Sequence, residues 1–158
     1  MSSKSARRRA SCVGPILKDY AFHRREYVSK WITIDRMDWK LVDAFLSNQY
    51  LPPKFEYPSF YKRLVELNLT NLEPWRILHD HLLTQRAVGL KKRYPSRALV
   101  PFARRVDSDD IACWDIDAGS GAISIVHDFA DPGWEQKEEY GDITGWFRKA
   151  IEDLIDFE

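Results

Sequence analysis

LVPFAR at residues 99–104, IACWD at 111–115 and AISIVHD at 122–128 are the stretches that decide the fold. Each is short and rich in apolar, β-branched or aromatic residues, and Asp/Ser/Gly clusters separate them, which is the pattern of β-strands. The intervals are too short for the crossover that a parallel pair needs, so we expect antiparallel pairing. Helical segments before and after should cover one face. The predicted fold class is therefore α+β, an antiparallel sheet with helices packed on one side.

The end of the chain carries the clearest helical pattern. From Ile143 to Ile155, apolar residues recur at helical spacing and charged residues occupy positions between them. This spacing forms one wide apolar stripe, so we expect a C-terminal amphipathic helix that belongs to the core. The stripe consists of Ile143, Trp146, Phe147, Ala150, Ile151, Leu154 and Ile155.

Helices are also expected before the strands. Asp38 can cap a helix with an apolar stripe over 39–46, which must end before the proline pair at 52–53. A second helix opens at Ser59. Pro74 suits the first position of a third helix that continues towards residue 94. Gly89 leaves open whether this last segment is one helix or two.

The charge is distributed unevenly along the chain. Residues 1–30 hold eight Lys/Arg against two Asp/Glu, whereas residues 107–158 hold fifteen Asp/Glu against three Lys/Arg. We expect a basic, partly disordered N-terminal arm over 1–30 and a single domain over 31–158. The run Arg7-Arg8-Arg9 can contact nucleic acid, but the acidic second half argues against such a partner.

The composition indicates a cytoplasmic protein. No apolar run approaches the ~20 residues of a membrane span, and the polar N-terminal stretch lacks the apolar segment of a secretory signal. The two cysteines, Cys12 and Cys113, form no CxxC pair, which favours a reducing compartment. We therefore expect no membrane association.

Catalytic motifs are absent from the sequence. It contains no G-x-S-x-G elbow, P-loop or G-x-G-x-x-G. Cys113 lies within a predicted strand, where a cysteine is usually a small buried hydrophobe. We predict a non-enzymatic protein without cofactor or bound metal. One alternative stays open, because Asp115, Asp117 and His127 are ligands of the kind that a metal-assisted hydrolase uses.

Carboxylates flank the strand at 111–115. Trp114 lies on the opposite face of this strand from Ile111 and Cys113, so it is exposed among acidic loops if helices cover only the Ile/Cys face. A partly exposed aromatic residue among polar groups is typical of a protein-binding hot spot. Alternatively, Trp114 packs under the N-terminal segment. The candidate partner-binding residues are Asp107, Asp109, Asp110, Trp114, Asp115 and Asp117.

These stretches resemble the SUKH superfamily, in its Smi/Knr branch. The resemblance rests on LVPFA at 99–103, the Asp-rich loop, IACWD at 111–115, VHD at 126–128 and the final amphipathic helix. LPP at 51–53 and FY at 60–61 are similar to the helix-initiating part of that domain, so the resemblance covers residues 39–158. The chain departs from the family in lacking a Gly-rich turn after the first helix, and its basic arm has no counterpart.

The resemblance implies a small α+β domain that binds another protein. Most bacterial members resemble immunity proteins that neutralise a toxin, often a nuclease, delivered by a neighbouring cell, and fungal members are regulators of cell-wall assembly and signalling. No catalytic signature is carried over. We therefore expect a cytoplasmic immunity protein whose acidic face docks on a basic toxin and occludes it, with a regulatory or scaffold role as the alternative. The sequence leaves the oligomeric state open.

Overall fold

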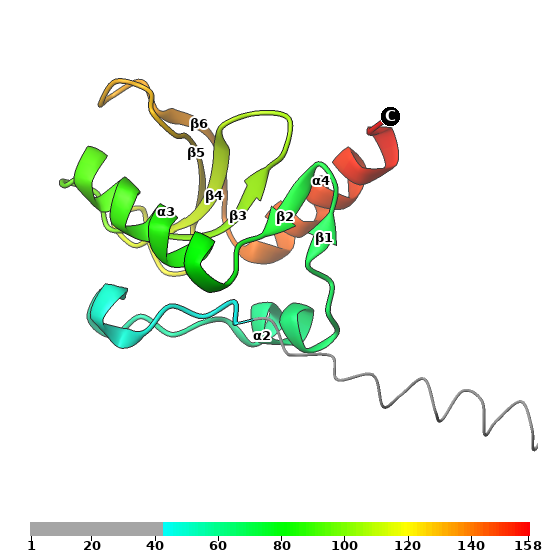
Figure 1. Ribbon diagram of the computed structural model, residues 1–158, viewed down its shortest axis with the longest axis horizontal. Helices are drawn as coiled ribbons and strands as arrows, with labels where there is room; N and C mark the ends of the chain where they lie inside the picture. The colour runs from blue at the N-terminus through cyan, green and yellow to red at the C-terminus, as the bar shows by residue number, and fades with distance from the viewer. Residues whose placement is uncertain (1–42) are drawn as a thin grey trace, which may run out of the picture. The chain divides into compact units, whose positions relative to one another are not determined.

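The structure, a computed structural model, describes residues 43–158 of the 158-residue chain. Its centre is an antiparallel sheet of six strands, each paired with the next along the chain (Figure 1). The strands are β1 (Asn71–Leu72), β2 (Trp75–Ile77), β3 (Leu99–Arg105), β4 (Asp110–Asp115), β5 (Ile123–His127) and β6 (Gln136–Tyr140). The helices are η1 (Asn48–Tyr50), α2 (Ser59–Glu66), α3 (Asp80–Arg93) and α4 (Ile143–Asp156). None of these described helices is long and apolar enough to cross a membrane.

The three predicted strands are confirmed as β3, β4 and β5. They pair antiparallel, with Val100 opposite Trp114 and Trp114 opposite Ile123. The register of β3 shifts between Pro101 and Ala103. Pro101 has no amide hydrogen to donate to a neighbouring strand, and prolines within sheets occur mainly at sheet edges, at strand starts and at such irregularities. The α+β class and the second and last predicted helices, α2 and α4, are also confirmed. The predicted basic arm over 1–30 lies outside the described residues.

Helices cover both faces of the sheet. β4 is buried at every position, although successive side chains of a strand point to opposite faces. α2 and α4 pack on the face that carries Trp114, through Tyr61 and Trp146. α3 packs against β3 from the other face (Figure 1). Leu99 of β3 and Asp115 of β4, which lie opposite each other in the sheet, belong to that face. The predicted packing of helices on one side of the sheet holds for α2 and α4, whereas α3 covers the opposite side.

Aromatic rings join distant parts of the sequence into one core. The ring centroid of Trp114 lies 4.3 Å from that of Phe102 and 4.9 Å from that of Tyr61. Phe102 lies 4.8 Å from Trp146 of α4, which lies 5.7 Å from Trp75 of β2. The Phe102–Trp114 pair is tilted and the other three pairs are edge-to-face. Aromatic pairs add about 0.5–1.5 kcal/mol each beyond the burial of area. These contacts hold α2 and α4 on the sheet.

α4 follows the predicted apolar stripe over most of its length. The Asp142 carboxylate caps it by accepting a hydrogen bond from the Gly145 N–H at 2.8 Å. The end of the stripe differs from the prediction, because Leu154 is 39% exposed and Ile155 is 76% exposed. The last turn of the helix extends beyond the sheet (Figure 1). The buried residues of α4 are Ile143, Trp146 and Ala150.

The predicted helix over 39–46 is not observed in its described part. Residues 43–47 have no helical structure, and exposed and buried side chains alternate there. The Leu46 N–H donates to Tyr57 Oη at 2.9 Å, and Tyr61 Oη donates to the Ala44 carbonyl at 2.9 Å. Because these tyrosines satisfy the backbone groups that a helix would satisfy internally, the segment packs without helical turns.

A hairpin replaces the predicted helix start at Pro74. β1 and β2 pair with Leu72 opposite Trp75, and the Glu73-Pro74 peptide bond between them is cis. Trp75 and Ile77 are buried on either side of an exposed residue, which is the period of a strand. A run this short fits both the helical and the strand period, so the sequence pattern was ambiguous.

Two further elements differ from the sequence expectations. α3 begins at Asp80, later than predicted, and passes through Gly89 as one helix. β6 was not predicted, because its sequence QKEEY is almost wholly polar and four of its five residues are exposed. It forms the edge of the sheet beyond β5, where charged residues discourage pairing with another strand.

Removing the cap of α4 should destabilise the domain. We expect Asp142→Ala to lower the free energy of unfolding by about 1 kcal/mol, because the Gly145 N–H loses its partner. Asp142→Asn is the matched control and should lose much less, since an amide oxygen accepts the same hydrogen bond. Urea denaturation of the full chain measures both, and equal losses would contradict this role for Asp142.

Candidate functional site

The predicted acidic face is divided between the two ends of the sheet. Asp110 begins β4 and Asp115 ends it. Five residues of extended strand place them about 16 Å apart and on opposite faces. Asp107 and Asp109 lie in the β3–β4 connection, just before Asp110, whereas Asp117 follows Asp115 in the β4–β5 connection. The predicted carboxylates therefore do not form one surface.

Trp114 is a core residue with only 1% of its surface exposed. The rings of Phe55, Tyr57 and Tyr61 cover it at centroid distances of 5.4, 5.4 and 4.9 Å. The alternative interpretation, that Trp114 is covered and not exposed, thus holds, with residues 55–61 as the cover. The hot-spot interpretation required an exposed Trp114. Because the side chain is buried, Trp114 cannot contact a partner at the surface.

Asp110 forms ion pairs within the domain. Its Oδ1 lies 2.7 Å from His127 Nδ1 and 3.1 Å from Lys137 Nζ. Burial works to raise the pKa of Asp110, but hydrogen bonds from His127, Lys137 and Ser108 outweigh burial and hold that pKa below its ordinary 3.8. The carboxylate therefore joins β4 to β5 and β6 and is 8% exposed as a residue.

The remaining carboxylates of the β3–β4 connection are exposed. Asp107 accepts hydrogen bonds from Arg105 Nε at 2.9 Å and Nη2 at 2.8 Å, which lower the pKa of Asp107. The Asp109 carboxylate forms no ion pair within residues 43–158. Of the predicted loop residues, these two are placed to meet a partner.

Asp115 anchors Arg97 inside the domain. Its Oδ2 accepts hydrogen bonds from Arg97 Nη2 at 2.5 Å and from Ser124 Oγ at 3.1 Å. Its Oδ1 accepts one from the Asp117 N–H at 3.2 Å. Because Asp115 is only 5% exposed and its oxygens are occupied, it serves the structure rather than a surface.

The alternative metal site is not formed. His127 ends β5 beside Asp110, whereas Asp115 and Asp117 lie at the other end of β4. Within the described range, 43–158, no three His, Cys, Asp or Glu side chains are grouped so that they could hold a metal ion. The three residues proposed for hydrolysis therefore share no site.

Exposed aromatic side chains lie instead in the connection between β5 and β6. Trp134 is 83% exposed and Phe129 is 63% exposed. The composition of residues 131–134 predicts a turn, and the turn is present, with the Trp134 N–H donating to the Asp131 carbonyl at 2.9 Å. Sequence reasoning missed this site, although a tryptophan in a turn of Asp, Pro and Gly is a usable signal.

The base of this loop is a buried carboxylate held by two arginines. The Asp128 side chain is 0% exposed, accepts a hydrogen bond from Arg86 Nη1 at 2.6 Å and pairs with Arg93. Its Oδ1 also accepts the Phe129 N–H at 3.1 Å. Because breaking a buried ion pair costs about 3–5 kcal/mol, these contacts fix the start of the loop.

α3 supplies both arginines from one side. Arg86 and Arg93 are two helical turns apart and therefore project in the same direction. A Cβ at Gly89, which lies between them, would stand 2.9 Å from a guanidinium nitrogen of Arg93. Glycine thus leaves room for Arg93, whose Cζ lies 4.4 Å from the ring centroid of Phe129 in a cation–π contact.

Further hydrogen bonds hold the rest of the loop. Tyr94 Oη donates to the Ala130 carbonyl at 2.9 Å. The Glu135 carboxylate accepts from the Gly133 N–H at 2.5 Å and from Arg97 Nη1 at 2.9 Å. The loop that carries Trp134 is therefore tied to the domain at its start, its middle and its end.

The exposed acidic residues adjoin this loop. The Asp128 N–H donates to the Asp109 carbonyl at 2.9 Å, which places the β3–β4 connection beside Phe129. Carboxylates and exposed rings thus share one end of the sheet. We call this set the aromatic loop surface, and it consists of Asp107, Asp109, Phe129, Asp131 and Trp134.

Comparison with known proteins adds no assignment. No family model, no curated protein and no solved structure matches the chain. Function must therefore be inferred from the residues and their geometry.

The domain should lose stability in acid as the carboxylate of Glu135 becomes protonated. Burial works to raise the pKa of Glu135, but hydrogen bonds from backbone N–H groups and from Arg97 outweigh burial and hold that pKa below its ordinary 4.5. The carboxyl therefore binds protons less tightly in the folded chain than in the unfolded chain. Its stabilisation is complete above pH 4.5 and is lost as the pH falls through the folded pKa.

We expect Glu135→Gln to lower the free energy of unfolding by about 1.5–3 kcal/mol at neutral pH, because a charged acceptor is lost. The decline of stability between about pH 7 and about pH 3 should also be shallower than in the unaltered chain. Urea denaturation across this range measures both effects, with the exposed Glu66→Gln as control. A slope equal to that of the unaltered chain would contradict the argument.

Proposed function

We propose that this chain is a non-enzymatic protein-binding module and that the aromatic loop surface is its docking site. The observation that carries the proposal is the 83% exposure of Trp134 on a loop fixed by buried ion pairs. Tryptophan is highly buried on average in folded proteins, and aromatic anchors dominate the binding energy of interfaces. An exposed tryptophan on a fixed loop is what an interface anchor requires.

The fixed loop favours binding because it is already ordered. Association normally costs about 0.5–1.5 kcal/mol for each flexible side chain that is immobilised, and more when a loop must be ordered. Asp128, Tyr94 and Glu135 hold this loop before any partner arrives. The indole of Trp134 can therefore bury its apolar surface at little entropic cost.

The partner that we propose is a basic surface of a toxin. Asp109 and Asp131 are exposed beside the two aromatic residues, and Asp107 lies in the adjoining connection. A nuclease is basic where it holds phosphates, so an acidic and aromatic surface can cover that site and exclude the substrate. This mechanism agrees with the immunity role that the SUKH resemblance implies. A regulatory or scaffold member of that family would present the same surface to a different protein.

Trp134→Ala should weaken binding of the partner. Co-expression of the tagged chain with the product of the adjacent gene, followed by co-purification, isolates the complex. We expect Trp134→Ala to raise Kd roughly 30-fold or more, which corresponds to the ~2 kcal/mol of an interface hot spot. Leu67→Ala is the matched control, since Leu67 is 50% exposed outside this surface and should leave Kd unchanged.

If Trp134→Ala leaves Kd unchanged, or if both variants weaken binding equally, the aromatic loop surface is not the docking site. If the neighbouring product neither co-purifies with the chain nor loses toxicity in its presence, that product is excluded as the partner. The two results are separable, because the first concerns the surface and the second the identity of the protein bound.

Asp109→Lys tests the charge of the surface. A charge at the rim of an interface acts mainly on the association rate, so we expect association to slow roughly tenfold at low salt and less at high salt. Glu56→Lys makes the same charge change at an exposed residue outside the surface and is the control. Surface plasmon resonance measures both rates. Equal slowing would mean that net charge, and not this surface, steers the partner.

A further inference from the structure

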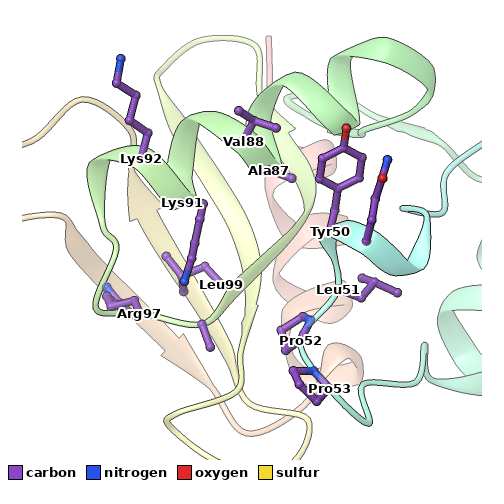
Figure 2. A pocket seen from close by; sticks show the side chains of 12 residues that line it. Tyr50, Leu51, Pro52, Pro53, Ala87, Val88, Lys91, Lys92, Arg97 and Leu99 are labelled. Carbon is purple, nitrogen blue, oxygen red and sulfur yellow. The ribbon is translucent and has the colours of Figure 1, made fainter.

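A groove lies between residues 49–53 and the C-terminal half of α3, with residues 97–99 beside it (Figure 2). Its volume is about 580 Å³, within the ~300–1,000 Å³ range of ligand pockets. Apolar side chains line most of it, among them Tyr50, Pro52, Val88 and Leu99. None of its residues belongs to the aromatic loop surface, so the groove is a separate candidate site.

Two lysines give the groove a positive rim. Lys91 extends toward Leu99, and Lys92 points outward from the same turn of α3 (Figure 2). Within the described part of the chain, Lys91 Nζ donates to the Pro95 carbonyl at 3.4 Å and neither lysine has an ion-pair partner. Free cations beside apolar side chains favour a ligand that brings carboxylates together with apolar groups.

The end of α4 has the complementary chemistry. Ile155 is 76% exposed, and Leu154 and Phe157 are each 39% exposed. Asp156 and Glu158 are exposed beside them and form no ion pair among the described residues. The segment LIDFE at 154–158 thus combines exposed apolar side chains with free carboxylates.

This segment cannot reach the groove of its own chain. Leu99 lines the groove at the start of β3, whereas Arg105 at the end of β3 donates to Asp153 of α4 at 2.9 Å. Six residues of strand separate these positions by about 20 Å. The end of α4 and the C-terminal half of α3 also lie at opposite sides of the domain (Figure 1). A second copy must supply the segment.

We propose that the groove binds residues 154–158 of a second copy of this chain. The apolar side chains of the segment enter the groove, and Asp156 and Glu158 pair with Lys91 and Lys92. Residues 1–42 fit the groove less well, because they hold ten Lys/Arg against four Asp/Glu and carry the same sign of charge as its rim. Since groove and segment are different surfaces, the contact is head-to-tail and either closes into a ring or extends into a filament.

Sedimentation velocity of the full chain at increasing concentration tests this contact. We expect self-association that weakens as salt is raised, because exposed ion pairs are screened. Lys91→Glu/Lys92→Glu and, separately, Asp156→Lys/Glu158→Lys should each raise Kd roughly tenfold or more. Lys91→Gln/Lys92→Gln, which adds no negative charge to the end of α3, should act in the same direction. The control is Lys62→Glu/Arg148→Glu, an equal charge change at exposed positions elsewhere, and it should leave Kd unchanged.

Combining both charge reversals in one chain tests the pairing itself. In a chain that carries Lys91→Glu/Lys92→Glu together with Asp156→Lys/Glu158→Lys, the basic segment of one copy meets the acidic groove of the next and the net charge is unchanged, so we expect self-association with restored affinity. Trp134→Ala should leave self-association unchanged, which separates this proposal from the proposed function. A monomer at every concentration up to about 1 mM, association unaffected by either reversal, or a doubly reversed chain that stays monomeric would overturn the proposal.

Discussion

The Asp128 carboxylate is buried between Arg86 and Arg93, and the loop that carries Trp134 depends on this contact. A carboxylate without solvent is stable only where cations and N–H groups replace its water. α3 must therefore lie where both arginines reach the loop after β5. The Arg93 guanidinium lies over Gly89, with a nitrogen 2.9 Å from where a Cβ at Gly89 would stand. The same ion pairs leave Phe129 and the turn after it facing outward.

The number of acidic residues along the sequence does not predict how many carboxylates are free at the surface of the domain. Many carboxylates of the acidic second half are neutralised inside the domain, as Asp115 is by Arg97 and Asp153 by Arg105 and Lys149. The two arginine pairs join segments that are distant in sequence, because the planar fork of each arginine meets two carboxylates. Arg97 pairs with Asp115 of β4 and with Glu135 before β6, and Arg105 pairs with Asp107 after β3 and with Asp153 of α4. At both proposed contact surfaces, charges without an ion-pair partner among the described residues lie beside exposed apolar side chains: Asp109 at one, and Asp156 and Glu158 at the other.

The two surfaces differ in how they are built. The aromatic loop surface presents a protruding Trp134 on a fixed loop, which suits insertion into a concave partner. The groove beside α3 is concave and suits an amphipathic segment such as residues 154–158. The groove and the aromatic loop surface share no residue. Residues 154–158, in contrast, follow Asp153, which shares Arg105 with Asp107 of the aromatic loop surface.

Local patterns in the sequence predict the strands β3, β4 and β5, their antiparallel pairing and the helices that begin at Ser59 and Ile143. These features follow from local periodicity, short connections and a capping residue, all of which are legible within a few positions. Which side chains are exposed could not be predicted from local patterns in the same way. Alternation along β4 shows that Trp114 and Cys113 face opposite sides, but only the segment that packs over each side decides which is covered. Tyr57 and Tyr61 cover Trp114, whereas nothing in the described part of the chain covers Trp134. Tertiary packing therefore chose which tryptophan is core and which is surface, because burial depends on contacts between residues far apart in the chain.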